Sequence, residues 1–592
     1  NVCFEIPIFP KETSTIADIK LSESADDLSE SLEEGTSMAI DRSNGVADVK
    51  SEVDDEVVLP RRGTRVRKAP DRYQANVAVK SITEPSNYYE MRKYPEHERK
   101  HWYGAMQKEL KSLKELGVYE MMPLPKGERA IGSRWVYKLK TGADGNVIHK
   151  ARLVAQGFAQ QEKDYDEVFA PSLRATTFRA TLVWAAKNKH SVHHIDVETA
   201  YLNAPLMHNI YMRIPPGIGN STKGLVWKLK KSLYGLKQSG FEWNKCIVSE
   251  LTKLGFVASL ADPCLFKRVK NGSRILLLLF TDDIAIVAKS NDEANDVING
   301  LERKFKIRKL GLISQYLGVD IERTKTGYRL SQVKKINSLL QKFNMVNCKI
   351  AKTPMEIGFV HSDEKHKLVD RELYQSLIGS LSYLSNWSRP DIAFSVNQLA
   401  RYNKEPNEYH WNSAKRILRY LKYTSNFKLY LEPKDELEIK AYADASFATD
   451  TIKRKSTSGI VVLIGDVLIG WKSLRQQHIS LSTMEAEFSS LSLLCTDLVY
   501  YKQLLKDLDI NVKSPIIVME DNQAAISMSN SIAVKTRSKH TDLRYLNVRQ
   551  SVKEGLIKLE YCASDENIAD QFTKAQGTVK HTECCLKYGM KI

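Results

Sequence analysis

The sequence predicts a multidomain chain that combines α/β and α+β structure, and three observations support this prediction. A length of 592 residues corresponds to about four domains, and a hydrophobic content of 42% is enough to bury a core in each of them. The neighbouring apolar runs 275–280 and 284–288 are typical of paired strands in a buried hairpin. Helical periodicity, as over 410–422, alternates with other strand-like segments.

The formal net charge of +17 hides an asymmetry along the chain. Residues 1–60 carry 15 Asp and Glu against 4 Lys and Arg, which leaves 84 basic against 56 acidic residues, or +28, on the remainder. The strongly basic composition of the residues after 60 indicates a polyanionic partner, most simply nucleic acid. A basic surface that serves only solubility is the alternative.

The first 60 residues are rich in Ser, Asp and Glu and have little apolar periodicity, so we expect a disordered acidic linker there. A basic segment, 61–75, follows it. Its run 61–68 is compatible with a nucleic-acid contact, a nuclear address or a solvated linker. Because the chain begins with Asn1 rather than Met, we expect a processed product or a fragment of a longer protein.

The eight cysteines are scattered and offer no zinc-binding spacing. No apolar run approaches the roughly 18 residues that a membrane span requires, and no signal peptide precedes the body. We therefore expect an intracellular protein with reduced thiols and without a membrane partner.

The two apolar runs of the predicted hairpin are joined by Thr281, Asp282 and Asp283. Burying two ionised carboxylates without a partner is costly, and a divalent metal ion is their natural partner. Asp196, which follows a short strand-like segment, is the candidate for a third ligand. The alternative for Asp196 is a helix cap for whatever begins at Thr199.

Strand-like segments 133–140 and 149–155 flank the hairpin-turn signal at 142–145. They carry cations that suit a triphosphate, although the strand alternation alone would also explain these cations as a solvent-facing surface. These cations are Lys138, Lys140, Lys150 and Arg152.

Six sequence blocks, in matching order and spacing, resemble the reverse transcriptase of copia-type LTR retrotransposons. The resemblance covers nearly everything from about residue 60 to the end and implies a right-hand polymerase of fingers, palm and thumb followed by an RNase H-like domain. We expect fingers and palm over 76–355, thumb or connection helices over 356–435 and the RNase H-like domain over 436–592. The blocks are Arg134–Lys138, Lys150–Phe158, Phe169–Pro171, Asp196–Leu202, Ser232–Gln238 and Leu317–Gly318.

The resemblance also implies roles for single residues. Asp196, Asp282 and Asp283 would hold two Mg²⁺ ions in the palm, with Mn²⁺ as a substitute. Arg152 would contact the triphosphate, and the ring of Tyr201 would exclude ribonucleotides by clashing with a 2′-hydroxyl. The nucleotide pocket would also be lined by Tyr234, Gly235, Lys237 and Gln238.

A second set of acidic residues lies in the C-terminal third. Together with strand-like segments 439–443, 460–464 and 516–519, these residues resemble the metal-binding quartet of the RNase H fold, which would hold a second pair of Mg²⁺ ions. The quartet is Asp444, Glu485, Asp521 and Asp570. The block 539–542 also resembles the family, and for its His540 a structural role is expected.

The sequence departs from the family pattern at two places. Phe280 and Thr281 replace the usual tyrosine and valine before the aspartate pair, which removes one hydroxyl contact to nucleic acid but spares the metal site. Ser239, Gly240 and Phe241 replace the usual Ala-Pro-Arg, and we expect a looser turn there.

Between the two acidic sets, His410–Lys422 has the pattern of an amphipathic helix. Its cationic face would either grip the backbone of a nucleic-acid hybrid or simply face solvent. The cations are Lys415, Arg419 and Lys422.

The expected function is RNA-directed DNA synthesis joined to RNase H. Its partners would be an RNA template, a DNA primer, the RNA–DNA hybrid and deoxyribonucleoside triphosphates, with integrase and capsid of the same element as further candidates. A cytoplasmic virus-like particle or the nucleus is the expected location. The main alternative is a decayed or domesticated element-derived protein that binds nucleic acid without catalysis, against which the seven acidic residues argue. A particle protein would need a zinc knuckle or capsid-like segment, and a host polymerase would not carry RNase H in this order.

Overall fold

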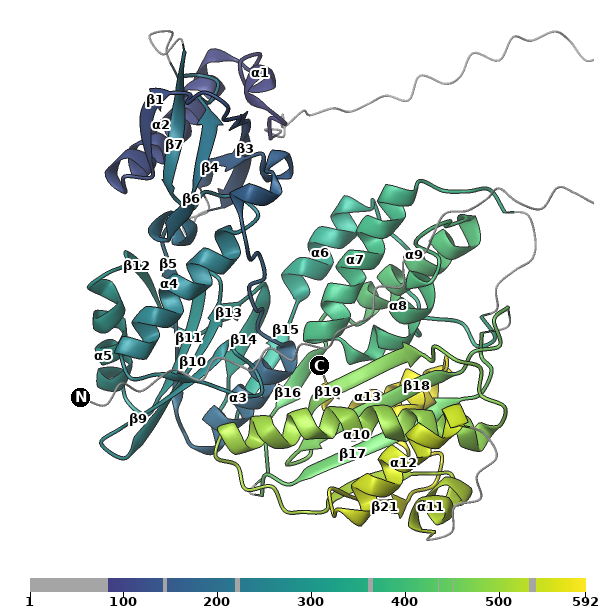
Figure 1. The fold of residues 1–592 in the computed structure, drawn as a ribbon. Helices are drawn as coiled ribbons and strands as arrows, with labels where there is room; N and C mark the ends of the chain where they lie inside the picture. Colours follow the sequence, from purple (N-terminus) through teal and green to yellow (C-terminus); the bar gives the residue numbers. More distant parts are fainter. Residues whose placement is uncertain are drawn as a thin grey trace, which may run out of the picture. The chain divides into compact units, whose positions relative to one another are not determined.

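The computed structural model describes residues 84–141, 146–218, 224–359, 366–434, 436–450, 452–531 and 539–591. The chain divides into two units, Asn1–Ser81 and Ile82–Ile592, and the described residues all belong to the second (Figure 1). The predicted acidic linker, basic segment and turn at 142–145 lie outside the described residues. No helix in the described part of the chain has the length and apolar character that crossing a bilayer demands.

The fingers region consists of two helices, a four-stranded sheet of order β1-β7-β6-β2 and the separate hairpin β3–β4. Helix α2 packs its apolar face on this region through Trp102, Met106 and Leu113, all buried. The predicted strands around 133–140 and 149–155 are confirmed as β3 and β4. The elements are α1 (Tyr88–Met91), α2 (Glu96–Glu115), β1 (Tyr119–Pro123), β2 (Ala130–Ile131), β3 (Ser133–Thr141), β4 (Val147–Ala155), β6 (Pro205–Arg213) and β7 (Leu225–Lys231). Two short 3₁₀ turns follow β4: η1 (Gly157–Ala159) and η2 (Glu162–Asp164).

The palm region is a six-stranded sheet of order β12-β5-β11-β10-β9-β8 covered by helices on both faces. Alternate residues of β10 belong to two different apolar clusters, Leu276 and Leu278 with α3, and Leu277 and Leu279 with α4 and α5. Covering both faces explains why these strands are continuously apolar in sequence. The elements are α3 (Ala175–Lys187), β5 (Ser191–Val197), η3 (Ala200–Asn203), α4 (Ser239–Lys253), β8 (Val257–Ala258), β9 (Leu265–Lys270), β10 (Ser273–Phe280), β11 (Asp283–Ala288), α5 (Asn291–Glu302) and β12 (Ile307–Leu312).

The thumb region joins a cluster of helices to a sheet of order β13-β14-β15-β16-β22. As the name is used here, it begins at Gln315, before the boundary at residue 356 that the sequence predicts, and it includes the strand β22 near the end of the chain. The predicted amphipathic helix at 410–422 is confirmed as α9, and its residues Ala414, Leu418 and Leu421 are buried. The elements are β13 (Gln315–Tyr316), β14 (Val319–Arg323), β15 (Tyr328–Ser331), α6 (Val333–Lys342), α7 (Arg371–Trp387), η5 (Pro390–Ile392), α8 (Ala393–Ala400), α9 (Glu408–Tyr423), β16 (Lys428–Leu431) and β22 (Met590–Lys591).

The C-terminal region has a five-stranded sheet of order β19-β18-β17-β20-β21. Strands β17, β18 and β19 are antiparallel, whereas β20 and β21 run parallel to β17. The three strands expected near 439, 460 and 516 are confirmed as β17, β18 and β20. The elements are β17 (Ile439–Ser446), β18 (Thr457–Ile464), β19 (Val467–Arg475), α10 (Thr483–Asp507), β20 (Ile516–Glu520), α11 (Gln523–Asn530), α12 (Lys539–Lys553), β21 (Ile557–Tyr561), η6 (Ile568–Phe572) and α13 (Thr578–Lys587).

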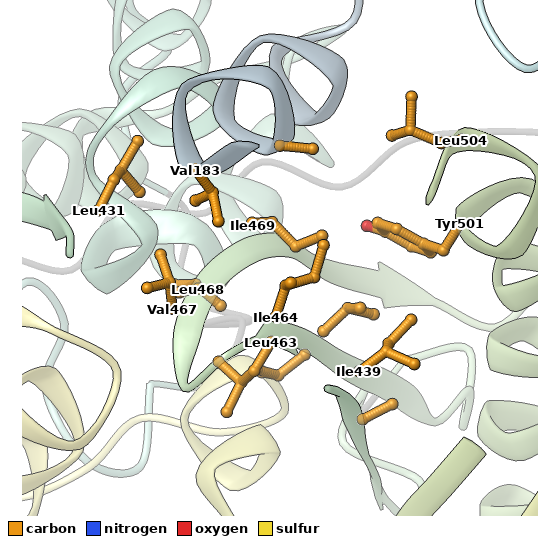
Figure 2. Packing of buried hydrophobic residues seen from close by; sticks show 14 of the residues in the cluster. Val183, Leu431, Ile439, Leu463, Ile464, Val467, Leu468, Ile469, Tyr501 and Leu504 are labelled. Atoms are coloured by element: carbon orange, nitrogen blue, oxygen red, sulfur yellow. The ribbon is translucent and has the colours of Figure 1, made fainter. Parts of the chain in front are cut away.

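Palm and C-terminal region share one apolar cluster, part of which Figure 2 shows around Ile469 and Tyr501. Gly470 is essential to this packing, because a Cβ atom there would lie 1.7 Å from the Tyr501 hydroxyl oxygen. Arg179 of α3 is 3% exposed and donates to the carbonyl oxygens of Ile469 and Asn386, both at 2.8 Å. Its guanidinium also lies 3.9 Å from the ring centroid of Trp471. Palm helix α3 is therefore bonded directly to strand β19.

Candidate active sites

The aspartate pair lies at the tip of the β10–β11 hairpin, and Asp196 lies beside it. Asp283, the first residue of β11, is the direct cross-strand partner of Asp196 in β5. The backbone amide of Val197 donates to the Asp282 carbonyl oxygen at 2.8 Å. The three carboxylates that the sequence proposed as metal ligands are therefore gathered at one end of the palm sheet. Asp196 does not cap η3, whose N-cap residue is Thr199 without a side-chain cap bond.

The electrostatics of this tip favour a cation. Burial raises the pKa of Asp282, and the negative charges of Asp283 and Asp196 raise it further. One neighbouring side chain offsets part of this charge, because Arg308 Nη2 lies 3.1 Å from Asp196 Oδ2. His194 Nε2 lies 3.2 Å from Asp283 Oδ1. The sheet register brings the three aspartates to one place, but their side-chain oxygens do not all lie within 4.8 Å of one another, the spacing found at the second carboxylate group described below.

The turn that carries the tip is held by contacts outside the aspartates. Thr281 has a left-handed backbone with φ of 54°, and Trp243 Nε1 donates to its carbonyl oxygen at 2.8 Å. The Tyr316 hydroxyl donates to the Asp283 carbonyl oxygen at 3.3 Å. Phe280, in place of the usual tyrosine, packs half-buried against the apolar cluster under the sheet. Phe280 and Thr281 thus both have defined contacts beside the aspartates.

Three of the proposed nucleotide-binding side chains form a group next to the tip. The guanidinium of Arg152 lies 4.9 Å from the ring centroid of Tyr234, and the Tyr234 and Tyr201 rings meet edge to face at 5.1 Å. Burial raises the pKa of Tyr234 to about 12, and Asp282 contributes to the rise while Arg152 opposes it. The group therefore lies within electrostatic reach of the aspartate tip. Lys138, by contrast, is engaged by Glu84.

The loop from Tyr234 to Gln238 is held against β4 by a close backbone contact. Gly235 has φ of 92°, and a Cβ atom there would lie 2.2 Å from the Ala155 carbonyl oxygen, so only glycine fits. Gln160 binds both sides of the loop: its Oε1 accepts from the Lys237 amide at 2.8 Å, and its Nε2 donates to Gln238 Oε1 at 3.0 Å. Gly235 and Gln238 therefore shape the loop from within.

The turn after Gln238, where the sequence predicts a looser connection, is closed by a side-chain hydrogen bond. Helix α4 begins at Ser239, whose hydroxyl donates to the Leu233 carbonyl oxygen at 2.7 Å and closes the turn. Both groups are buried, so this bond does not exchange readily with water.

A second carboxylate group lies at the carboxyl ends of the parallel strands β17 and β20. Asp444 of β17, Asp521 directly after β20 and Glu487 of α10 offer ligand oxygens that all lie within 4.8 Å of one another. It is the one such group among the described residues. Parallel pairing of β17 with β20 brings Asp444 and Asp521 together from positions 77 residues apart in the printed sequence. Oxygen ligands at this spacing suit a hard divalent cation.

The choice of Glu485 as a member of this group needs correction, because Glu487 occupies the place instead. The Glu485 carboxylate accepts from the Leu481 amide at 2.7 Å, and the Glu485 amide donates to the Ser482 hydroxyl at 3.1 Å. Glu485 is thus part of the N-terminal cap of α10. The sequence pattern Ser482-x-x-Glu485 is itself the signature of a capping box, and it indicates a capping role for Glu485.

The charge of this second group is poorly compensated within the protein. Burial raises the pKa of Asp444 to about 7, despite an opposing hydrogen bond from Thr573, and Asp570 and Asp521 raise it further. Burial likewise raises the pKa of Glu487, and the nearby Glu520 adds to the effect. Among the described residues, one carboxylate oxygen of Glu487 and one of Glu520 are buried without a hydrogen-bond partner. A bound divalent ion would supply the missing partner for Glu487.

Asp570 lies close to this group, but its oxygens are directed elsewhere. Its carboxylate forms ion pairs with Lys574 and, at 2.7 Å, with Lys580, and accepts from Gln576 Nε2 at 3.0 Å. Thr573 connects the two acids, because its hydroxyl lies 2.5 Å from Asp444 Oδ2 and its backbone amide bonds to the Asp570 carbonyl oxygen. The side chain of His540 lies outside the described residues.

A sheet with three aspartates at its tip, flanked by fingers and thumb regions, is the layout of a right-hand polymerase fold, and an α/β region with a second carboxylate group follows it. The family model described as reverse transcriptase (RNA-dependent DNA polymerase) matches residues 116–357. The chain belongs to this family, among the Pol proteins of copia-type retrotransposons, as the resemblance implied.

Two curated relatives illustrate the relationship. The retrovirus-related Pol polyprotein from transposon TNT 1-94 of Nicotiana tabacum is 35% identical over 546 residues, covering 90% of this chain and 41% of that protein. The putative transposon Ty5-1 protein of Saccharomyces cerevisiae is 31% identical over 303 residues, covering 50% of this chain and 98% of that protein. The chain thus spans about two fifths of the length of the tobacco polyprotein.

Among solved structures, the chain is similar to the foamy viral protease-reverse transcriptase in complex with an RNA/DNA hybrid. The TM-score is 0.43 at 13% identity, covering 78% of this chain and 53% of that chain. So weak a similarity adds nothing to the family assignment.

The raised pKa of Asp444 predicts how metal binding depends on pH. The folded carboxyl keeps its proton up to about pH 7, whereas its ordinary value is 3.8, so rising pH destabilises the metal-free fold across this window. Metal binding requires the ionised form and therefore becomes stronger over the same window. We expect the difference in thermal midpoint between Mg²⁺-containing and chelator-containing samples to widen from pH 6 to pH 8.

Asp444→Asn is the matched variant for this measurement, because it keeps the shape of the side chain and removes its titration. The widening should largely disappear in Asp444→Asn. A midpoint difference that is independent of pH in the unmodified protein would contradict the assignment of Asp444 as a metal ligand.

Proposed function

We propose that this chain is an RNA-directed DNA polymerase with an associated RNase H, which copies an RNA template into DNA and degrades the RNA of the resulting hybrid. The observation that carries the proposal is the cross-strand pairing of Asp196 with Asp283 beside the Asp282 turn, within the segment matched by the reverse transcriptase family. The partners in this proposal are an RNA template, a DNA primer and deoxyribonucleoside triphosphates.

In the polymerase site, Asp196, Asp282 and Asp283 would hold two divalent ions, with Mg²⁺ as the natural choice and Mn²⁺ as a substitute. Such ions, when bound, lower the pKa of the primer 3′-hydroxyl and neutralise the departing pyrophosphate. The protein's own contribution would be position: the hairpin register, the Trp243 bond and the Tyr316 bond hold the backbone of the turn that carries Asp282 and Asp283.

The nucleotide would lie on the group formed by Arg152, Tyr201 and Tyr234. Arg152 is the only one of the three with a positive charge, and that charge acts on Asp282, whose pKa it lowers. It would therefore attract a triphosphate to the aspartate tip. Tyr201, packed edge to face against Tyr234, would present its ring to the sugar. Gly235 and Gln238 shape the pocket wall, and Lys237, which donates to the Tyr165 hydroxyl at 2.8 Å, lies on its exposed side.

In the RNase H site, Asp444, Glu487 and Asp521 would hold the divalent ions, with Asp570 completing the set once its lysine partners move to the nucleic acid. The bound ions would orient an attacking water toward the RNA backbone. Lys574 and Lys580, both paired to Asp570, are then candidates for contacting phosphate groups. Glu485 has no part in this proposal beyond capping its helix.

The strongly basic body fits a polyanionic partner. Most of the proposed cationic face of α9 also has contacts within the protein: Lys422 donates to the Cys348 carbonyl oxygen at 2.8 Å, and Lys415 lies 5.2 Å from the Trp411 ring centroid. Binding of the hybrid by α9 would compete with these internal contacts, and it stays part of the proposal. Integrase and capsid of the same element, and a location in a virus-like particle or the nucleus, belong to it as well.

A primer-extension assay on poly(rA) with an oligo(dT) primer tests the polymerase. We expect Mg²⁺-dependent extension by the purified chain and a loss on the order of a hundredfold or more in Asp282→Asn, because misplaced metal ligands disrupt the geometry of the reaction. Asp292→Asn is the matched control, since Asp292 is an exposed acid in the first turn of α5.

Absence of extension by the unmodified protein, combined with retained binding of the template and primer, would contradict the proposal. It would instead support a decayed or domesticated element-derived protein that binds nucleic acid without catalysis.

The same assay with ribonucleoside triphosphates tests the sugar selection by Tyr201. Tyr201→Ala should incorporate ribonucleotides that the unmodified protein rejects, because removal of the ring makes room for a 2′-hydroxyl. Tyr201→Phe keeps the ring and should keep the rejection. Equal rejection of ribonucleotides by Tyr201→Ala would exclude Tyr201 as the selecting residue.

A further inference from the structure

A buried chain of polar side chains connects the thumb helices with η6, the short turn that carries Asp570. It begins at Arg389 and Asp391 around η5, which form an ion pair with side chains 1% and 0% exposed. It continues through Tyr420 of α9 and His581 of α13 to Gln571 of η6. Polar groups buried this deeply are costly unless each finds its partner, so the chain constrains every segment that contributes to it.

The hydrogen bonds of this chain have a single consistent direction. The Tyr420 hydroxyl donates to Asp391 Oδ2 at 2.8 Å, so its oxygen accepts from His581 Nε2 at 3.0 Å. His581 Nδ1 must then accept from Gln571 Nε2, at 3.0 Å. The Gln571 amide oxygen in turn accepts from the Tyr588 hydroxyl at 3.0 Å.

The charge state of His581 agrees with this direction. Burial lowers the pKa of His581 to about 4, although the nearby Asp391 opposes the shift. The ring is therefore neutral near pH 7 and has one donor and one acceptor nitrogen, as the chain requires. Arg389 completes the far end, where Nη1 donates to the Thr424 carbonyl oxygen at 3.2 Å.

The hydrogen-bonded chain of side chains ends at Gln571, next to the second carboxylate group. Gln571 directly follows Asp570 in η6, and Thr573 of the same segment bonds Asp444. Strand β18 packs closely against η6. A Cβ atom at Gly459 of β18 would lie 2.6 Å from the Ala569 carbonyl oxygen of η6, so the two backbones are in direct contact. A small rotation of η6 would therefore move Asp570 and Thr573 together.

We propose that Tyr420, His581 and Gln571 are positioning residues for the RNase H centre, which hold η6 in place from the thumb region. None of the three reaches the carboxylate group itself; they act through the backbone of η6. The proposal rests on the proposed RNase H function, and it adds that RNA cleavage depends on helix α9 in a way that DNA synthesis does not.

The test compares two buried tyrosines of the same apolar cluster in the full chain. Tyr420→Phe removes one oxygen atom from the chain of bonds, leaving His581 Nε2 without its acceptor. Tyr374→Phe is the matched control, because its buried hydroxyl donates to the Leu399 carbonyl oxygen at 2.8 Å and, among the described residues, forms no hydrogen bond with η6. We expect Tyr420→Phe to lower RNase H cleavage by about tenfold and to raise the Mg²⁺ concentration it needs, as for residues that orient metal ligands.

DNA synthesis should be unchanged in both variants, and Tyr374→Phe should cleave RNA normally. His581→Gln keeps an N–H group near the Nε2 position and should retain more cleavage than His581→Leu. Equal loss of cleavage in Tyr420→Phe and Tyr374→Phe, or parallel loss of DNA synthesis, would overturn the positioning role.

Hydrogen exchange separates this proposal from the RNase H assignment itself. Amides of residues 568–573 should exchange faster in Tyr420→Phe than in Tyr374→Phe, whether or not the protein cleaves RNA. If the unmodified protein fails to cleave a hybrid, the RNase H function is wrong, and unchanged exchange at 568–573 would independently overturn the positioning role.

Discussion

The constraint on which both centres depend is the cost of concentrating negative charge where water is scarce. At the hairpin tip, Asp282 is disfavoured in its ionised form by burial and by two neighbouring aspartates. At the second centre, burial and other nearby acids disfavour the ionised forms of Asp444 and Glu487. Such arrangements destabilise a fold unless a cation offsets them, and oxygen ligands at these positions suit divalent ions.

The pairing of strands in the two sheets brings these acidic residues together. In the palm, antiparallel register puts Asp196 opposite Asp283; in the C-terminal region, parallel pairing of β17 with β20 brings Asp444 near Asp521. Buried contacts such as those of Arg179 join the palm to strand β19, and the Tyr420–His581–Gln571 chain joins the thumb to η6. The two centres are thus supported by a shared framework of polar bonds and apolar packing.

Much of the palm site could be predicted from the sequence, because continuous apolar strands and an Asp-Asp turn leave few alternatives for Asp282, Asp283 and Asp196. The sequence pattern favours Glu485 over Glu487 because the two acids are only two residues apart, and the phase of α10 determines which of them lies at the carboxylate group. The bonds of Asp570 to Lys574 and Lys580 depend on tertiary placement of η6 and α13. Likewise, no local pattern indicates that the terminal strand β22 joins a sheet with β16.

Metal binding by two matched glutamate variants tests most directly whether these acids form a metal centre. Glu487→Gln and Glu485→Gln change neighbouring positions of one helix, remove one charge each and keep the side-chain length. Calorimetric titration with Mn²⁺ should show loss or strong weakening of one binding event in Glu487→Gln, with Glu485→Gln binding like the unmodified protein. Unchanged binding in Glu487→Gln, or a loss confined to Glu485→Gln, would contradict the account.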